Sequence, residues 1–265
     1  MFTKTTQYYD RIYAFKDYAG EVERIRALLA RVHPRARTIL DVACGTAEHA
    51  RLLAEHYAVD GVDIERDFIA QARRKVPTGE FIVGDMRRLA IGKKYDVVQC
   101  LFSSIGYLTA EADVVRALRC FAAHLNPGGR IIVEPWITPD RWLPGATHLS
   151  PPVDHPDLKL VRMNTSTRIG NLSLLNFHYL IATDNGVEYL QEDHTLALYS
   201  IDEMLSFFVA AGLDAQHEDV GLSGRGLYVA SIDESRFSAG RFSLRPRSCC
   251  CWFSVRTAAG IIGNA

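Results

Sequence analysis

The sequence lacks the paired cysteines that would indicate a zinc site or a disulfide framework. Three of its six cysteines, Cys44, Cys100 and Cys120, are isolated, and the other three are consecutive at positions 249–251, so no CxxC pair occurs. The nine histidines also lack the spacing of metal ligands. We therefore predict no metal site.

Long apolar runs and an excess of charge of one sign are missing as well. No apolar segment approaches the ~18 residues that a membrane span needs, and the first ten residues lack the apolar core of a secretory signal. Lysine and arginine number 30 against 31 for aspartate and glutamate, which gives a net charge of -1. This balance argues against nucleic acid and membranes as partners, and we expect a cytoplasmic protein.

What is present is an alternation of helical and strand patterns in a chain of 265 residues, 48% of them apolar. Apolar residues recur every three or four positions over 17–32, which predicts an amphipathic helix that ends before Pro34. The expected strands then cover 38–42, 58–62, 80–83, 95–101 and 130–134, and the expected helices cover 48–57, 67–76 and 111–125. A turn is expected at 126–129. Alternating strands and helices predict an α/β fold with a parallel, doubly wound sheet.

The pattern changes between Lys159 and Tyr199, where alternating segments are separated by turn signals at 170–171 and 184–186. We predict an antiparallel, three-stranded insertion here, within about 140–200, that covers the site. A helix over 202–211, capped by Gly212, and strands over 214–218 and 227–231 would complete the sheet. Residues 232–265 have no period and carry five arginines, so we expect one domain over 1–231 and a poorly ordered, dispensable tail.

The loop after the first strand has one glycine, Gly45, whereas a dinucleotide site needs G-x-G-x-x-G for close approach of the pyrophosphate. It therefore suits a ligand without phosphate better than it suits NAD. Asp63 lies 22 residues after Asp41, where a carboxylate can accept both ribose hydroxyls of an adenosine. Asp85 can accept from an adenine amino group while Met86 covers the ring. These positions together predict an adenosine pocket, although Asp63 as a helix cap and Asp85 as a turn residue are the structural alternatives.

Five strings are distinctive: D-V-A-C-G-T at 41–46, G-D-M-R at 84–87, F-S-S-I-G-Y-L at 102–108, V-E-P-W at 133–136 and S-G-R-G-L at 223–227. In these strings the sequence resembles the class I S-adenosylmethionine (SAM) methyltransferases, and more closely the dTDP-amino-sugar N,N-dimethyltransferases that complete desosamine- and mycaminose-type sugars. The likeness runs from about Tyr8 to Ala230. The first string is common to all SAM methyltransferases, and those at 102–108 and 223–227 are much narrower. Ala47 departs from the pattern, because the family usually has a third loop glycine there.

The resemblance implies a Rossmann-like, seven-stranded methyltransferase sheet with an antiparallel β insertion, and SAM as the cofactor. Asp63 would hold the ribose, Asp85 and Met86 the adenine, and the backbone near Gly45 the methionine part. Two tyrosines would close over the cofactor, although aromatic residues on an apolar helix face equally often pack in a core. The cofactor residues implied are Tyr9, Tyr18, Ala43, Gly45, Asp63, Ile64, Asp85, Met86 and Leu101.

On the substrate side, Arg225 lies between two glycines, and a guanidinium with nearby N–H donors suits a diphosphate. A solvated surface turn is the alternative. Tyr107 follows the fourth strand near the point where strand order reverses and ligands bind. Tyr107 and Glu134 are the candidate catalytic residues, since either can steady the ammonium that methyl transfer forms. The substrate residues implied are Phe102, Tyr107, Trp136, Tyr179 and Arg225.

By this resemblance the expected activity is SAM-dependent N-methylation, with dimethylation, of a dTDP-linked deoxyamino sugar, as in antibiotic biosynthesis. The alternatives are a small-molecule N- or O-methyltransferase whose acceptor lacks a nucleotide diphosphate, and a non-catalytic SAM-binding protein. A nicotinamide oxidoreductase is disfavoured by the missing glycines. The sequence does not identify the amino sugar, the ring position, the number of methyl groups or the oligomeric state, for which a homodimer is one option.

Overall fold

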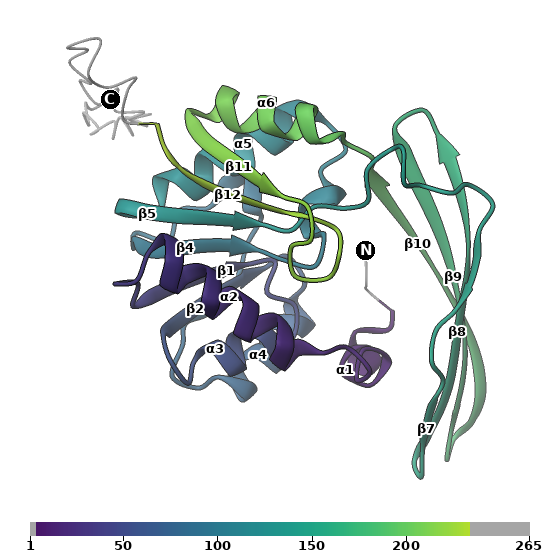
Figure 1. Cartoon of the computed structure of the whole chain (residues 1–265). Coiled ribbons are helices and arrows are strands. Elements are labelled where there is room, and N and C mark those ends of the chain that lie inside the picture. The colour runs from purple at the N-terminus through teal and green to yellow at the C-terminus, as the bar shows by residue number, and fades with distance from the viewer. Residues whose placement is uncertain (1–3, 234–265) are drawn as a thin grey trace, which may run out of the picture. The chain divides into compact units, whose positions relative to one another are not determined.

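The computed structural model describes residues 4–233, so the tail that the sequence predicts lies outside the described residues apart from its first two positions. Seven strands form one sheet, hereafter the first sheet (Figure 1). Strands β3, β2, β1, β4 and β5 run parallel to one another, whereas β12 is antiparallel to both β5 and β11. The predicted doubly wound sheet is thus confirmed. Its order is β11 (Leu213–Glu218), β12 (Leu227–Ile232), β5 (Leu125–Val133), β4 (Tyr95–Cys100), β1 (Thr38–Val42), β2 (Ala58–Asp63) and β3 (Phe81–Val83).

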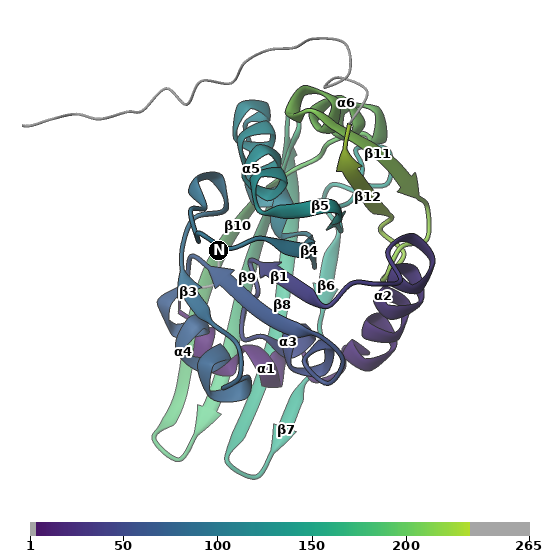
Figure 2. The ribbon, with the colours of Figure 1, turned by 90° about the vertical axis from the view of Figure 1, so that its left-hand side faces the viewer.

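Helices cover both faces of the first sheet, as its doubly wound order requires (Figure 2). On one face lie α2 (Tyr18–Val32), α3 (Glu48–Leu53) and α4 (Arg66–Lys75), and on the other α5 (Glu111–Ala123) and α6 (Ile201–Ala211). The helices form where apolar residues repeat on one side, as at Val22, Ile25 and Leu29 of α2, all buried. A capping box of Ser200 and Glu203 begins α6, and Gly212 ends it with a φ of 85°.

One predicted turn, over 126–129, is instead the irregular beginning of β5. The strand starts at Leu125, opposite Tyr95, and is next in register at Arg130, opposite Val97. Five residues on β5 therefore correspond to two on β4. Gly128 allows this irregularity because it adopts a φ of 75°. The residues that predict a turn are therefore present, but they form a bulge inside the paired strand.

The insertion forms a separate sheet, hereafter the second sheet, whose strands are all antiparallel. It has five strands rather than the three predicted. The long strands β8 (Leu158–Ile169), β9 (Leu172–Thr183) and β10 (Gly186–Ala197) pair through the two predicted turns. Two short strands, β6 (Thr147–Leu149) and β7 (Val153–His155), pair with the free edge of β8. Sequence periodicity missed them because each has three mostly exposed residues, and only backbone pairing defines them.

The N-terminal segment connects the two sheets. After a 3₁₀ turn at Thr6–Tyr8, α1 (Tyr9–Ile12) lies between them (Figure 1). Asp10 pairs with Lys75 of α4 at 2.6 Å, and Arg11 pairs with Asp157, in the turn before β8, at 2.8 Å. Thr5 donates to Glu192 of β10 at 2.6 Å. Among residues 4–233, no helix is both long enough and apolar enough to span a lipid bilayer.

Candidate active site

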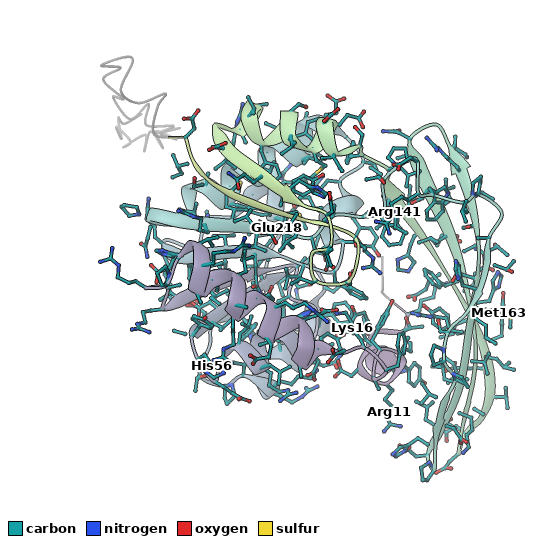
Figure 3. All side chains as sticks on the ribbon, in the orientation of Figure 1. Arg11, Lys16, His56, Arg141, Met163 and Glu218 are labelled. Carbon is teal, nitrogen blue, oxygen red and sulfur yellow. The ribbon has the colours of Figure 1, made fainter. Side chains whose placement is uncertain are left out.

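A cavity of about 840 Å³ lies between the carboxyl ends of β1 to β5 and the inner face of the second sheet. The second sheet covers the site, as predicted. Connecting segments also line this space, as Lys16 does from the segment before α2 and Arg141 from the segment between β5 and β6 (Figure 3). Most of the residues singled out in the sequence line it, namely Tyr9, Ala43, Gly45, Asp63, Ile64, Asp85, Met86, Phe102, Tyr107, Trp136 and Arg225.

Four of the predicted residues lie elsewhere. Tyr18 and Leu101 line an adjoining cavity of about 40 Å³, together with Asp41. Tyr179 is fully buried in a small core against Ile12 and outside both linings. Glu134 is also fully buried, below the floor of the large cavity.

The loop after β1 folds onto the end of β2. Asp63 accepts hydrogen bonds from the N–H of Gly45 at 2.8 Å and from that of Glu65 at 2.9 Å. Burial raises the pKa of Asp63, and these backbone bonds oppose the rise. Ala47 has a φ of 65°, a backbone conformation that glycine adopts more readily than alanine. The carboxylate thus organises the loop while it faces the cavity.

The neighbouring residues fit an adenosine. Ile64 is 47% exposed although it is a large apolar residue, and it lines the cavity with Met86, so the two offer apolar surfaces to a flat ring. Asp85 begins a 3₁₀ turn (Met86–Arg88) and accepts from Arg87, which lowers its pKa. A side chain at Gly45 would meet no atom within 4 Å, so this loop leaves room for a ligand. These observations fit SAM at the ends of β1 to β3.

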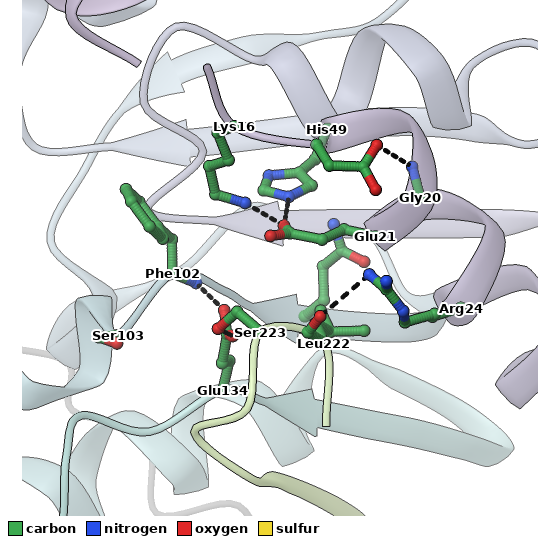
Figure 4. A network of polar contacts seen from close by, with 12 residues as sticks. Lys16, Gly20, Glu21, Arg24, His49, Phe102, Ser103, Glu134, Leu222 and Ser223 are labelled. Atoms are coloured by element: carbon green, nitrogen blue, oxygen red, sulfur yellow. Dashed lines mark hydrogen bonds and ion pairs between the residues drawn. The ribbon is translucent and has the colours of Figure 1, made fainter. Parts of the chain in front are cut away.

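A first polar cluster joins α2 to the edge of the cavity (Figure 4). Glu21, 4% exposed, accepts from Lys16 and interacts with Nε2 of His49 at 2.7 Å. Burial alone would raise the pKa of Glu21, but these two partners outweigh it and lower the pKa. The Lys16 ammonium also lies 4.8 Å from the centre of the Phe102 ring. The cluster therefore fixes a cation against an aromatic wall of the site.

A second cluster in the same view has Glu134 at its centre (Figure 4). Its carboxylate accepts the N–H of Phe102 at 2.7 Å and the hydroxyl of Ser223. Phe102 has a φ of 51°, which is unfavourable for an aromatic residue and needs such support. Arg225, two residues after Ser223, stacks 5.2 Å from the Phe102 ring and 5.5 Å from that of Trp136. Glu134 thus positions residues that line the cavity, and direct contact of Glu134 with a substrate stays a prediction.

Tyr107 and His194 form a hydrogen-bonded pair in the wall of the cavity. The Tyr107 hydroxyl lies 2.6 Å from Nδ1 of His194, which comes from β10. Burial lowers the pKa of His194 to about 4 and raises that of Tyr107. At neutral pH the imidazole is therefore uncharged, and its tautomer determines which of the two groups donates in this bond.

Several lining residues were missed by sequence reasoning. Arg162, Asn164 and Ser166 are buried on the inner face of β8, alternating with exposed Met163 and Thr165. Because both faces of this strand are largely polar, the alternation does not reveal which face is buried. Other missed lining residues are Tyr13, Trp142 and Phe177.

We predict that Asp63→Ala lowers SAM affinity by about 10- to 100-fold, since each lost hydrogen bond to a charged acceptor is worth roughly 1.5 to 3 kcal/mol. Calorimetric titration with SAM measures this. Asp60→Asn is the matched control, because Asp60 lies on the same strand but bonds to Tyr95 at 2.8 Å, away from the cavity. Unchanged SAM affinity in Asp63→Ala would overturn the assignment.

Comparison with known sequences places these features in a family. Residues 39–129 match a methyltransferase domain family. The chain is 38% identical over 216 residues to dTDP-3-amino-3,6-dideoxy-alpha-D-glucopyranose N,N-dimethyltransferase of Streptomyces fradiae, covering 81% of this chain and 84% of that protein. It is 36% identical to dTDP-3-amino-3,4,6-trideoxy-alpha-D-glucopyranose N,N-dimethyltransferase of Streptomyces venezuelae, covering 81% and 91%.

Solved structures agree with the sequence comparison. DesVI of Streptomyces venezuelae matches with a TM-score of 0.81 and 33% identity over 88% of this chain and all of that one. The sugar N-methyltransferase KedS8 from Streptoalloteichus matches at 0.78 with 36% identity, covering 83% and 90%. SAM-bound CalS10, an amino pentose methyltransferase from Micromonospora echinaspora, matches at 0.77 with 28% identity, covering 87% and 97%. The chain therefore belongs to the SAM-dependent methyltransferases, in the family of the dTDP-amino-sugar N,N-dimethyltransferases.

Proposed function

We propose that this enzyme methylates, and then dimethylates, the amino nitrogen of a deoxyamino sugar carried on dTDP. One observation carries the proposal: a single cavity joins residues that fit SAM, at the ends of β1 to β3, to aromatic residues at the ends of β4 and β5 and to Arg225 of the loop before β12. The named relatives support the same substrate class. A cavity of about 840 Å³ is within the range of sites for ligands of this size. Mass spectrometry of products from SAM and a panel of dTDP-amino sugars tests the proposal.

When bound, SAM supplies a methyl group on a positively charged sulfur, and its transfer requires an uncharged nitrogen in line with the departing sulfur. Correct placement of the nitrogen supplies much of the rate acceleration in such a displacement. Phe102, held by Glu134, and Trp136, whose indole N–H donates to Ser173 at 2.9 Å, form a rigid aromatic wall. This wall limits the orientations that a sugar ring can take.

Tyr107 is the residue best suited to orient the amine. When His194 carries its hydrogen on Nε2, its Nδ1 accepts the hydroxyl hydrogen of Tyr107, and the oxygen lone pairs are then the groups that Tyr107 can present to the cavity. A lone pair there can accept an N–H of the substrate amine and stabilise the positive charge that grows on nitrogen during transfer. A strong base is not required, because water can take the proton that the amine loses before the reaction.

We predict that Tyr107→Phe lowers kcat/KM for the amino sugar by about 10- to 100-fold, the value of one charge-assisted hydrogen bond. The acidic limb of the pH profile of kcat/KM should keep the midpoint that it has in the native enzyme, because His194, with a pKa of about 4, does not titrate there. Tyr199→Phe is the control, since Tyr199 donates to the carbonyl of Leu108 at 2.9 Å and does not line the cavity. A shifted limb in Tyr107→Phe would instead indicate that the pair exchanges protons with substrate.

For Arg225→Ala we expect the KM for the dTDP sugar to rise about 10-fold or more, with SAM affinity unchanged, because a guanidinium contact to a diphosphate is lost. We expect kcat to fall as well, since Arg225 donates to Ser103 at 3.2 Å and so helps to fix the turn after β4. Arg130, which is half-buried outside the cavity lining and donates to the carbonyl of Gly128 at 2.7 Å, provides the control variant. An unaltered kcat/KM for the nucleotide sugar would favour an acceptor without a diphosphate.

We also propose a homodimer formed through the outer face of the second sheet. Met163, Leu180 and Tyr189 are 51%, 54% and 58% exposed on adjacent strands, and Figure 3 shows Met163 on the side away from the first sheet. An exposed apolar face of this kind favours burial against a second copy. We predict a dimer by light scattering that Leu180→Glu converts to monomer, whereas Val220→Glu, at a 75% exposed position outside this sheet, does not. A monomeric native protein would refute the dimer.

Two further expectations stay predictions: the cytoplasmic location, and one catalytic domain over 1–231 with a dispensable tail after it. The last strand ends at Ile232, which fits that boundary.

A further inference from the structure

Arg162 is a buried cation on the inner face of the second sheet. It lies in the middle of β8, is 6% exposed and lines the cavity. Its guanidinium carbon is 4.7 Å from the centre of the Tyr13 ring and 5.2 Å from that of Phe177. Its Nε donates to the hydroxyl of Ser150 at 2.8 Å. These contacts hold the guanidinium in one orientation.

The guanidinium of Arg162 contacts aromatic rings and a hydroxyl rather than a carboxylate. Within residues 4–233 it forms no ion pair, and its buried Nη1 has no hydrogen-bond partner. The carboxylate of Glu192, itself buried, is engaged by the N–H of Lys4 at 2.6 Å and by Thr5. Burying a charge without a counter-charge is unfavourable, so such an arginine is expected where a ligand supplies the anion.

We propose that Arg162 binds a phosphate of the substrate's diphosphate, an inference that rests on the proposed function. A planar guanidinium that lines a cavity and has unused N–H donors matches phosphate oxygens. Tyr13 packs 5.2 Å from Phe102, whose ring in turn packs 5.2 Å from Arg225, so aromatic rings separate the two arginines. In this proposal the diphosphate lies between Arg162 of the second sheet and Arg225 of the loop before β12. The covering sheet is thereby part of the substrate site.

The position of Arg162 also distinguishes the diphosphate from the other anion in the reaction, the carboxylate of SAM. The residues that fit SAM lie on the first sheet, around Gly45 and Asp63, whereas Arg162 projects from the second. Asn164 and Ser166 continue the polar inner face of β8 beside it. We therefore expect variants of Arg162 to change nucleotide binding and to leave SAM binding unaffected.

Calorimetry and thermal unfolding with dTDP, thymidine and SAM test this assignment. Arg162→Met keeps an apolar chain between the two rings but removes the charge. We expect it to weaken dTDP binding at least 10-fold, with thymidine and SAM affinities unchanged. Its unliganded Tm should not fall, because an uncompensated buried charge is removed. Arg168→Met, at an exposed position on the same strand, is the control and should bind dTDP as the native protein does.

Arg162→Lys keeps the charge without the planar fork, and we expect it to recover part of the dTDP affinity. Native dTDP affinity in Arg162→Met would overturn this inference alone and leave the proposed function standing. A lower unliganded Tm with equal weakening of all three ligands would overturn it in favour of a structural role. Loss of SAM binding alone would assign Arg162 to the SAM carboxylate. A native enzyme that does not bind dTDP would overturn the proposed function together with the inference.

Discussion

The fully buried carboxylate of Glu134 is the interaction on which the substrate half of the site depends. A carboxylate without exposure must be hydrogen-bonded, and this one is satisfied by the N–H of Phe102 and the hydroxyl of Ser223. It thereby holds Phe102 in a left-handed conformation and joins the loop after β4 to the loop before β12. Arg225, on that second loop, then reaches the Phe102 ring. One buried charge thus fixes the geometry of an aromatic residue and, through it, of a cation.

The parts of the fold and site on the first sheet could be predicted from the sequence because local pattern determines them. Alternating strands and helices specify a parallel sheet, and residues at or just after the ends of its strands, such as Asp63 and Asp85, must gather at one edge. The second sheet was harder to predict. The face of β8 that carries Arg162 is recognisable only once both sheets are placed, and the short strands β6 and β7 have no pattern of their own.

Glu134 and Tyr179 show a different limit of sequence reasoning. Glu134 belongs to the string at 133–136, and Tyr179 is a substrate residue that the resemblance implies, yet both side chains are fully buried outside the lining of the cavity. A distinctive string identifies a position that the site requires. Such a string does not show whether a side chain contacts the ligand or instead supports another residue that does, because the site needs both kinds of residue. For Glu134 the neighbour is Phe102, and for Tyr179 it is the small core that includes Ile12 of α1.

The left-handed alanines of the loop after β1 have a consequence for the entropy of cofactor binding. Ala43 and Ala47 have φ values of 58° and 65°, conformations that glycine adopts freely and alanine adopts only under constraint. The constraint is visible, since Ala47 is fully buried and its N–H donates to the carbonyl of Cys44 at 2.9 Å. A loop with alanine at these positions has fewer alternative conformations than a glycine-rich one. It therefore loses less conformational entropy when a ligand orders it, and its shape is set by folding rather than by the cofactor.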